Sequence, residues 1–386
     1  MKGERKLESN IRYVGVKDRD LKLFEGQYPL KDGVTYNSYI IMDEKITIMD
    51  SVDKRAGEEW LKNVKAELNG KEPYYLVISH MEPDHSANIK LLADTFPNMK
   101  LVGNIKTFMY LNQMFKIDNL EERKVVVNEG DELDLGEHKL KFIMAPMIHW
   151  PEVMFSYEEK EKILFSADAF GTFGCGDDAW PDEARRYYIN IVGKYGAQVQ
   201  AILTKLKNLE INGIYPLHGE VIEDNLEYYI EKYNLWSKYE VEEKGVLIAY
   251  SSMHGNTKEV AYKLKEQLKE NNINETVEVI SLNEDDITEA VSLAFKYDRL
   301  IVASPTYNGE LFPATEMFLK LLKSKGYQKR EVGFIENGTW APMAAKQMKE
   351  VFEQMKEIEF IEPVVSIKTT LNEASLDSLK QLAKNI

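Results

Sequence analysis

The segment SHMEPDHSANI, residues 79–89, combines two histidines with two carboxylates. His80, Glu82, Asp84 and His85 all fall within six consecutive positions. Imidazole nitrogens and carboxylate oxygens are side-chain donors that first-row transition metals bind in proteins. The pattern H-x-E-x-D-H is therefore typical of a loop that contributes to a binuclear metal site.

Three further candidate ligands occur singly, each directly after an apolar run that predicts a β-strand. They are His149 in IMAPMIHW, Asp168 in ILFSADAF and His218 in IYPLHGE. Loops at strand ends are held in place by the sheet, which is what a metal site requires. We therefore expect one binuclear site formed by His80, Glu82, Asp84, His85, His149, Asp168 and His218.

Each of these residues also has an ordinary structural explanation. A histidine at a strand end most often hydrogen-bonds within its loop, and Asp84 could cap a helix that begins near Ser86. Four of the six histidines in the sequence nevertheless belong to this set, which favours a shared metal site. Three carboxylates accompany them, and such mixed ligation suits iron or manganese better than it selects zinc.

The stretch IAYSSMHGNTKEVA, residues 248–261, predicts an anion-binding loop between a strand and a helix. Hydroxyl groups and free backbone N–H groups gather at such a helix N-terminus, and Gly255 permits a tight turn. The stretch has neither the Gly-Lys-Ser/Thr of a triphosphate loop nor the G-x-G-x-x-G of a dinucleotide loop. A capped helix without a ligand is the ordinary alternative.

Two later loops, residues 303–313 and 336–342, combine glycine with an aromatic residue, Tyr307 or Trp340. In an open α/β sheet, ligands bind beyond the carboxyl ends of the strands, where these loops lie. An anion loop beside two aromatic loops fits a phosphate-bearing planar ring, whereas ordinary loop aromatics are the alternative. The expected binding residues are Ser252, Met253, His254, Gly255, Asn256, Thr257, Pro305, Thr306, Tyr307, Asn308, Gly309, Asn337, Gly338, Thr339 and Trp340.

The spacing of apolar residues divides the chain into two regions. Strands and helices are mixed in the first region, where residues 181–208 are predicted to be helical. In the second region, apolar strands alternate with helices, which predicts a parallel sheet covered on both faces. The charged segment KYEVEEKG predicts a boundary between two domains, residues 1–243 and 244–386. The predicted strands of the second domain are 245–251, 276–282, 298–305, 331–337 and 360–368, and its predicted helices are 257–271, 285–296, 313–325, 341–357 and 373–385.

The composition excludes several classes of protein. The 386 residues carry a net charge of −15, and an acidic surface repels nucleic acid. The single cysteine, Cys175, excludes an internal disulfide and a four-cysteine metal site. Residues 1–16 show no apolar leader, and no run approaches the roughly 20 apolar residues of a membrane helix. We therefore expect a cytoplasmic protein.

The order of the metal ligands resembles the metallo-β-lactamase fold, an αββα sandwich, over about residues 30–240. Hydrolases of that superfamily mostly carry histidine at the position of Glu82 and bind zinc, so this carboxylate is a departure. The strands and loops after residue 244 resemble flavodoxin, a doubly wound α/β fold with a five-stranded parallel sheet that binds FMN. As a whole, the chain resembles the flavodiiron proteins, also called A-type flavoproteins.

This resemblance implies two non-haem iron ions and FMN as cofactors. Transferred by motif, the ligand sets would be His80, Glu82 and His149 for one iron and Asp84, His85 and His218 for the other, with Asp168 bridging. Members of the family differ in whether the residue matching His85 reaches the metal.

The resemblance also implies an oxidoreductase that reduces dioxygen to water, nitric oxide to nitrous oxide, or both. Electrons would pass through FMN from a separate donor, most naturally a rubredoxin, because this chain lacks the four cysteines of a rubredoxin site. The family further implies a head-to-tail homodimer or a dimer of dimers. No motif in the sequence decides between the two gases.

Two other functions compete with this interpretation. The first is a binuclear metallohydrolase whose second domain takes no part in the reaction. Glu82 and the three flavin-type loops argue against this function. The second is an FMN electron carrier whose first domain is a metal-free scaffold, and the dense ligand set opposes that reading.

Overall fold

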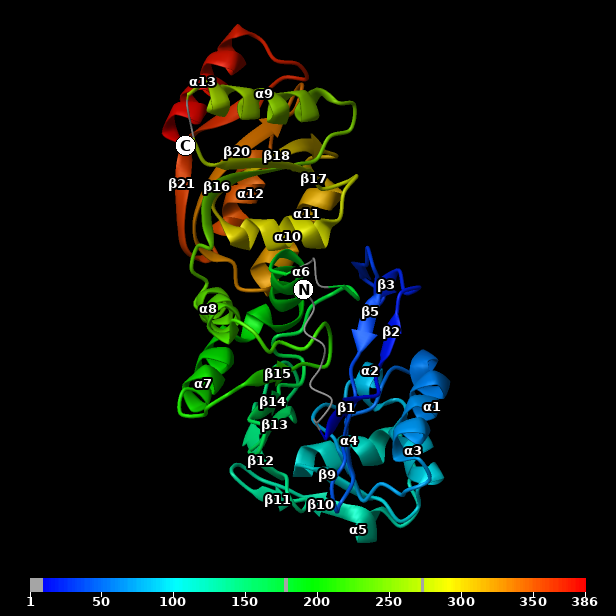
Figure 1. The fold of residues 1–386 in the computed structure, drawn as a ribbon. Helices are drawn as coiled ribbons and strands as arrows, with labels where there is room; N and C mark the ends of the chain where they lie inside the picture. Colours follow the sequence, from blue (N-terminus) through cyan, green and yellow to red (C-terminus); the bar gives the residue numbers. More distant parts are fainter. Residues whose placement is uncertain (1–9, 177–179, 272–273) are drawn as a thin grey trace. The chain divides into compact units, whose positions relative to one another are not determined.

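The computed structural model describes residues 10–176, 180–271 and 274–386 (Figure 1). The N-terminal residues 1–9, part of the segment predicted to lack an apolar leader, lie outside the described residues. The chain forms two compact units. Residues up to Tyr188 and Ala197–Asn234 make the first unit, and Ile189–Gly196 and Leu235–Ile386 make the second. Within the described ranges, no helix combines the length and apolar character needed to cross a membrane.

Two β-sheets form the centre of the first unit. The first sheet has the order β1 (Ile11–Tyr13), β6 (Tyr39–Ile41), β7 (Thr47–Met49), β8 (Tyr75–Val77), β9 (Lys100–Gly103) and β10 (Lys124–Val126). The second has the order β11 (Glu132–Asp134), β12 (Lys139–Met144), β13 (Met154–Glu158), β14 (Ile163–Phe165) and β15 (Gly213–Tyr215). Two short ribbons, β2 (Val16–Asp18) with β5 (Val34–Tyr36) and β3 (Leu23–Phe24) with β4 (Tyr28–Pro29), complete the strands.

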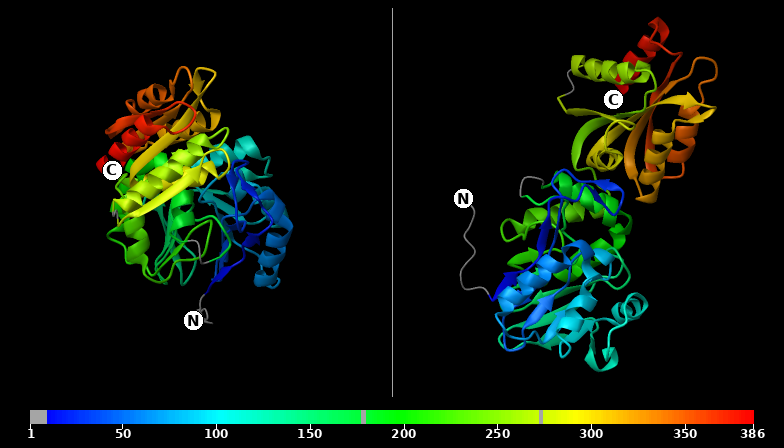
Figure 2. Two further views of the ribbon diagram at one scale, coloured as in Figure 1. Left: turned by 90° about the horizontal axis from the view of Figure 1, so that it is seen from above. Right: turned by 90° about the vertical axis from the view of Figure 1, so that its right-hand side faces the viewer.

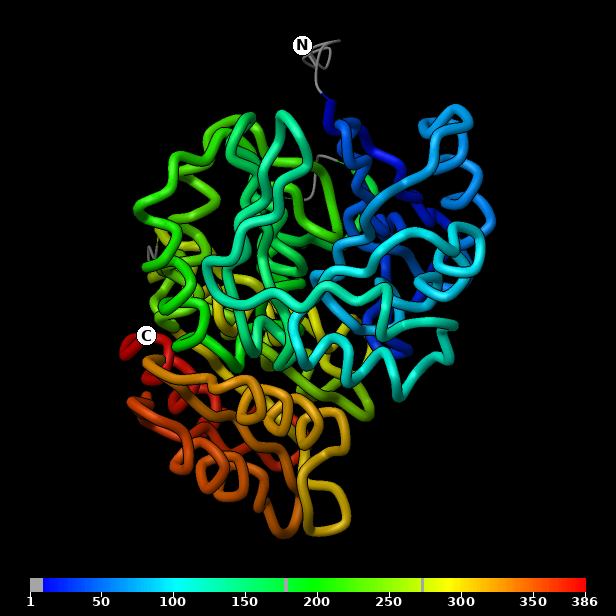
Figure 3. Tube along the Cα trace, turned by 90° about the horizontal axis from the view of Figure 1, so that it is seen from below, coloured from blue at the N-terminus to red at the C-terminus, as the bar shows by residue number. Residues whose placement is uncertain are grey.

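The two sheets pack face to face through alternate side chains of their strands. Met49 and Val77 of the first sheet share one buried cluster with Phe142, Met154 and Phe165 of the second. Figure 3 shows the two halves of this unit side by side, one in blue to cyan and the other in green. The outer helices are α1 (Gly57–Leu68), α3 (Ile89–Thr95) and α4 (Ile105–Met114) beside the first sheet and α7 (Gly196–Leu206) beside the second. The predicted αββα sandwich is therefore confirmed.

The segment predicted to be helical over residues 181–208 is not one regular α-helix. It contains α6 (Asp182–Tyr187), a π-helical turn, a 3-10 turn and then α7. Gly193 and Gly196 lie at the irregular part, and glycine disfavours the interior of a helix.

The second unit contains a parallel sheet in the order β17 (Thr276–Ser281), β16 (Glu243–Tyr250), β18 (Tyr297–Tyr307), β20 (Gln328–Asn337) and β21 (Lys356–Ile367). The helices α9 (Asn256–Glu270) and α13 (Glu373–Asn385) cover one face (Figures 1 and 2). The other face carries α10 (Ile287–Lys296), α11 (Pro313–Ser324) and α12 (Ala344–Phe352). This arrangement confirms the predicted doubly wound, flavodoxin-like fold.

The helix predicted over residues 341–357 is too long at both ends. The observed α12 covers Ala344–Phe352, and Lys356 already pairs with Gln328 at the start of β21. Thr306 fixes the N-terminal end, because its Oγ1 accepts hydrogen bonds from the backbone N–H groups of Met343 and Ala344.

Asp50 connects the ends of two strands just before the loop that contains His80. Its backbone N–H donates to Val77 O over 2.9 Å, and its Oδ1 accepts the N–H of Ser79 over 2.6 Å. Ser38 donates to the backbone oxygen of Asp50. Asp50 is buried, so these bonds fix where the chain leaves β8.

We expect Asp50→Ala to lower the free energy of unfolding by about 1–3 kcal/mol, because the buried N–H of Ser79 would lose its acceptor. Asp50→Asn retains an acceptor oxygen and should therefore lower the free energy of unfolding by less than Asp50→Ala. Urea unfolding of the full chain, followed by circular dichroism, measures both effects. Asp131→Ala, at an exposed turn where Asp131 accepts the N–H of Asn128, is the control. An equal loss in the control would contradict a specific role for Asp50.

Candidate functional site

The seven predicted metal ligands come from four loops at the ends of strands. His80 and Glu82 follow β8, and Asp84 and His85 lie in the short helix α2 (Pro83–Ser86) that comes next. The remaining three positions are His149 after β12, Asp168 after β14 and His218 after β15. The structure brings all seven side chains together into two adjoining groups.

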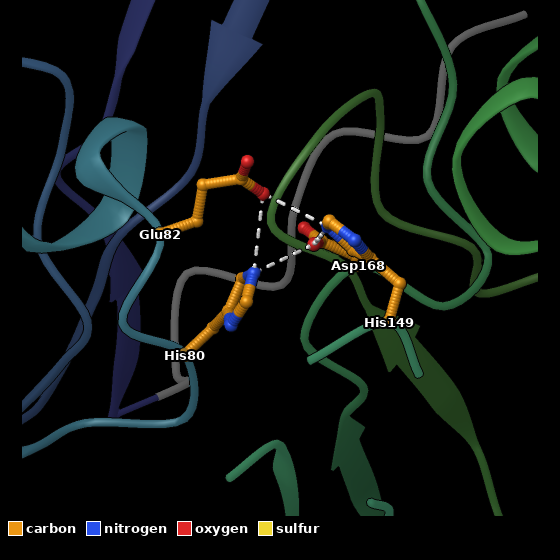
Figure 4. A group of neighbouring side chains, drawn as sticks. All are labelled: His80, Glu82, His149 and Asp168. Carbon is orange, nitrogen blue, oxygen red and sulfur yellow. Dashed lines mark hydrogen bonds and ion pairs between the residues drawn. The ribbon is translucent and has the colours of Figure 1, made fainter. Parts of the chain in front are cut away.

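The first group contains His80, Glu82, His149 and Asp168, whose ligand atoms all lie within 4.8 Å of one another. Figure 4 shows their polar atoms pointing toward one another, with His80 and Glu82 from one segment facing His149 and Asp168. Oδ2 of Asp168 lies 3.3 Å from Nε2 of His80 and 3.2 Å from Nε2 of His149. Nε2 of His149 is also 2.8 Å from Oε2 of Glu82.

The second group contains Asp84, His85 and His218. The Nε2 atoms of the two histidines are 3.0 Å apart. Oδ2 of Asp84 lies 3.3 Å from Nε2 of His85 and 3.2 Å from Nε2 of His218. Three donor atoms therefore converge on one small volume.

Asp168 faces both groups. Its Oδ2 contacts the first group, whereas its Oδ1 lies 3.3 Å from Nε2 of His85 and 3.8 Å from Nε2 of His218. The residue is 1% exposed, so its two oxygens have no access to bulk water. A carboxylate with one oxygen directed at each of two donor sets has the arrangement of a ligand that bridges two cations.

The hydrogen bonding of the site fits the binding of cations. Nε2 of His149 and Oδ1 of Asp168 are buried, yet within the described ranges neither forms a hydrogen bond of normal geometry. Oδ1 of Asp84 is likewise buried and unpaired among the described residues. Leaving such atoms unsatisfied is costly, and a cation between them would satisfy them.

The ionisable groups of the site shift one another's pKa values. Burial raises the pKa of Glu82, but contacts with His149 and His80 outweigh burial and hold that pKa at about 2. Burial lowers the pKa of His149, but its contacts with Asp168 and Glu82 raise the net pKa to about 9. Without a cation, the carboxylates are therefore ionised and His149 carries a proton, which a bound cation would have to displace.

Two of the histidines are oriented by acceptors behind their rings. Nδ1 of His218 donates to the backbone oxygen of Thr35 over 2.7 Å, and Nδ1 of His80 lies 2.8 Å from Oε1 of Glu152. Both bonds leave Nε2 free to face the other ligands. Glu152 is absent from the predicted site. Its signal in the sequence is an acidic residue in HWPEVMF, three positions after His149 and directly before an apolar strand.

A cavity of about 300 Å³ lies at the carboxyl ends of the strands in the second unit. Its lining residues are Ser252, Met253, His254, Asn256, Thr257, Pro305, Thr306, Asn308, Gly309, Asn337, Gly338, Thr339, Trp340, Ala341 and Thr369. The three predicted loops therefore meet around one cavity.

Two predicted binding residues do not line this cavity. Gly255 is instead the N-cap of α9, with φ of 89°, a conformation that glycine adopts without strain. The ring of Tyr307 packs edge-on against Phe312, with the ring centroids 6.0 Å apart. The involvement of these two residues in cofactor binding therefore stays a prediction.

Ala341 and Thr369 are the lining residues that the sequence interpretation missed. Thr369 follows β21, and its N–H donates to Oδ1 of Asn337 over 2.9 Å. Nδ2 of Asn337 donates in return to Thr369 O. The signal in the sequence was the fifth apolar strand, whose carboxyl end must lie at the same edge of a parallel sheet.

The chemistry of the cavity differs between its two ends. Ser252 and Thr257 supply hydroxyl groups beside the N-terminus of α9, where free backbone N–H groups favour an anion. Trp340 lies at the rim with 92% of its surface exposed, so its ring is available to a planar ligand. The cavity therefore fits a phosphate at one end and an aromatic ring at the other.

Comparisons with known proteins agree with a metal site in the first part of the chain and a flavin-type cavity in the second. A model of the ODP family of beta lactamases matches residues 34–219, and a flavodoxin domain model matches residues 247–365. An uncharacterized protein of Methanocaldococcus jannaschii is 30% identical over 358 residues, which cover 90% of this chain and 89% of that protein. The anaerobic nitric oxide reductase flavorubredoxin of Vibrio vulnificus is 29% identical over 86% of this chain and 70% of its own length.

Solved structures show the same similarity along the whole chain. The rubredoxin oxygen:oxidoreductase of the anaerobe Desulfovibrio gigas has a TM-score of 0.89 at 26% identity, covering 99% of this chain and 97% of that one. The flavodiiron protein of Giardia intestinalis has a TM-score of 0.85 at 26% identity, covering 97% and 95%. These relationships imply FMN and a non-haem di-iron centre as the cofactors. The chain belongs to the flavodiiron proteins and is an oxidoreductase.

Proposed function

We propose that this protein reduces dioxygen to water, nitric oxide to nitrous oxide, or both, and that FMN relays the electrons from a separate donor. The observation that carries this proposal is the position of Asp168, whose two oxygens face two groups of mixed histidine and carboxylate ligands. The names of the relatives support it, since one is a nitric oxide reductase and another a rubredoxin oxygen:oxidoreductase. In this proposal, residues 1–243 contain the metal chemistry and residues 244–386 the flavin.

The proposed metal ligands fall into two sets. They are His80, Glu82 and His149 for one iron and Asp84, His85 and His218 for the other, with Asp168 between them. When bound, the iron pair supplies two adjacent one-electron reductants that also act as Lewis acids toward a diatomic substrate. The three carboxylates offset the cation charge, which favours the higher oxidation state of each ion.

Aromatic residues pack against some of the proposed ligands. The rings of Phe24 and Tyr187 lie 5.3 and 5.6 Å from the ring of His218. Trp150 packs edge-on against His80 at 5.3 Å. A low-dielectric surround strengthens the electrostatic interactions between the ligands and the bound cations.

A pocket of about 330 Å³ gives a route to the proposed ligands. Leu21, Phe24 and Tyr36 form part of its wall, and Glu82 and Asp84 lie within it. Its volume exceeds what a diatomic gas needs. Its wall also contains the charged residues Glu25, Asp53 and Arg55, and its apolar part suits a neutral diatomic molecule. We propose that dioxygen or nitric oxide enters here.

The proposed flavin site uses the two ends of the cavity in the second unit. Ser252, Thr257 and the N-terminus of α9 would bind the phosphate, and Trp340 would lie beside the ring. When bound, FMN supplies one- or two-electron exchange between a donor and the metal centre. Asn337 fixes the position of the Thr369 loop through its two hydrogen bonds.

We also propose a separate protein, such as rubredoxin, as the electron donor, which the name of the Desulfovibrio gigas relative supports. The remaining expectations from the family resemblance are likewise proposals. They are a cytoplasmic location and a head-to-tail homodimer or dimer of dimers.

The proposed function is tested by purifying the full chain and measuring metals, flavin and gas consumption with a defined electron donor. We expect two iron ions and one FMN per chain, and steady-state consumption of at least one of the two gases. Zinc without flavin absorbance would favour a metallohydrolase. Full consumption of both gases by an Asp168→Ala variant would favour an electron carrier without metal chemistry.

We expect Glu82→His to lower iron occupancy or reductase turnover while FMN remains bound. The exchange replaces an anionic ligand with a neutral one, which raises the net charge of the site by one and disfavours ferric iron. Iron analysis, flavin absorbance and steady-state turnover measure the three properties. Glu58→His, at an exposed position of α1, is the matched control. Iron content and turnover equal to those of the control would refute a special role for this carboxylate.

We expect Trp340→Ala to weaken FMN binding by about 2- to 10-fold or to shift the flavin potential, since one aromatic contact contributes about 0.5–1.5 kcal/mol. Iron content should not change. Fluorescence titration of the flavin-free protein with FMN gives the affinity. Tyr262→Ala removes another exposed aromatic side chain, 46% exposed on α9 but not part of the cavity lining. If both variants bind FMN with the same affinity and potential as the parent, Trp340 does not contact the flavin.

A further inference from the structure

A buried carboxylate, Glu152, lies directly behind one of the proposed iron ligands. Its Oε1 is 2.8 Å from Nδ1 of His80 and accepts the backbone N–H of Met81 over 2.8 Å. Glu152 is 1% exposed, and its side chain and that of His80 are both fully buried. The carboxylate therefore interacts with the ligand segment rather than with solvent.

The two oxygens of Glu152 differ in their hydrogen bonding. Oε1 receives both hydrogen bonds, whereas Oε2 is buried and has no hydrogen-bond partner in the part of the chain that the structure describes. A buried carboxylate is normally surrounded by donors, because its desolvation is costly. Among the described residues, the polar partners of Glu152 Oε1 are the ring of His80 and the backbone N–H of Met81.

Three of the four ligand histidines differ in what faces their Nδ1 atoms. Nδ1 of His80 faces a carboxylate, and Nδ1 of His218 faces the neutral backbone oxygen of Thr35. Nδ1 of His85 is buried without a partner among the described residues. A carboxylate behind an imidazole orients the ring, fixes its tautomer and raises the basicity of the opposite nitrogen. The first group thus contains a histidine whose Nε2 is a stronger electron-pair donor to a metal than the Nε2 of either histidine of the second group.

Neighbouring elements hold Glu152 in this position. Its backbone oxygen accepts a hydrogen bond from Nδ2 of Asn104, whose Oδ1 caps α4 through the N–H groups of Lys106 and Thr107. Two residues later, the N–H of Met154 donates to Ser79 O, next to His80. The loop is therefore tied both to α4 and to the end of β8.

We propose that Glu152 is a positioning residue that orients His80 and increases its donation to the iron of the first group. In this proposal the two irons would differ in reduction potential, and the iron bound by His80 would have the lower one. The inference rests on the proposed di-iron function, and it adds the residue that distinguishes the two metal positions.

The same sandwich contains a matched pair away from the metal site. Nδ1 of His138 lies 2.9 Å from Oε1 of Glu158, and both side chains are fully buried. Both oxygens of Glu158 also accept backbone N–H groups, those of Lys160 and Glu161. Glu158→Gln therefore removes the charge from a buried histidine–carboxylate pair without altering a proposed ligand.

The test compares Glu152→Gln with Glu158→Gln in the full chain. Gln retains the size and the acceptor oxygen of Glu but removes its charge. Three quantities are measured in each variant: Fe²⁺ affinity of the metal-stripped protein by competition with a chromophoric chelator, the reduction potentials of the iron pair, and the flavin potential. The parent protein is measured first, and failure of the parent to bind two iron ions would refute the proposed function rather than this inference.

For Glu152→Gln we expect Fe²⁺ affinity at one of the two positions to fall by about 10- to 100-fold, the usual effect of removing such a partner. The potential of that iron should shift to more positive values, while the flavin potential stays at the parent value. Glu158→Gln should leave iron affinity and both potentials unchanged, whatever its effect on melting temperature. Parent-like affinity and potentials in Glu152→Gln, or equal losses in the two variants, would overturn the proposal.

A second measurement does not depend on the folding of a variant. In the parent protein loaded with Zn²⁺, the Nδ1–H proton of His80 should give a downfield, slowly exchanging NMR signal, as should that of His138. Absence of a protected Nδ1–H signal assigned to His80, with the His138 signal present, would also overturn the proposal.

Discussion

The buried carboxylate of Asp168 is the constraint on which the rest of the first unit depends. An ionised carboxylate that is 1% exposed is tolerated only where opposite charge or hydrogen-bond donors compensate it. Here each oxygen faces a different set of histidines, so the loops that carry those histidines must reach the same place. The two sheets meet this requirement by ending several strands at one edge.

The fold provides the rigidity that such a convergence needs. Strands pack through an apolar interface, and polar ligands occur only where the strands end and the chain turns. Short-range bonds then fix the loops, as Asp50 does for the segment before His80 and Thr35 for the ring of His218. The polar site therefore depends on the apolar sandwich, because a buried strand holds each ligand loop in place.

Much of the organisation follows from local features of the sequence. The H-x-E-x-D-H loop, the single ligands after apolar runs and the alternation of strands and helices after residue 244 correspond to the observed elements. The errors lie where a contact distant in sequence decides the outcome. The helix predicted to begin at residue 341 begins at Ala344, where Thr306 accepts the backbone N–H group from 38 positions away.

The sequence by itself determined the order of strands and helices and the residue types available for metal and flavin, because periodicity and motif spacing are properties of short segments. The family followed from the resemblance of those motifs to known proteins. Only the tertiary structure decided how those residues are used. It directs one oxygen of Asp168 to each ligand group, places Glu152 behind His80, and brings Thr369 to the cavity beside Asn337. Each of these depends on the packing of segments that are far apart in the chain, and no local pattern encodes such a contact.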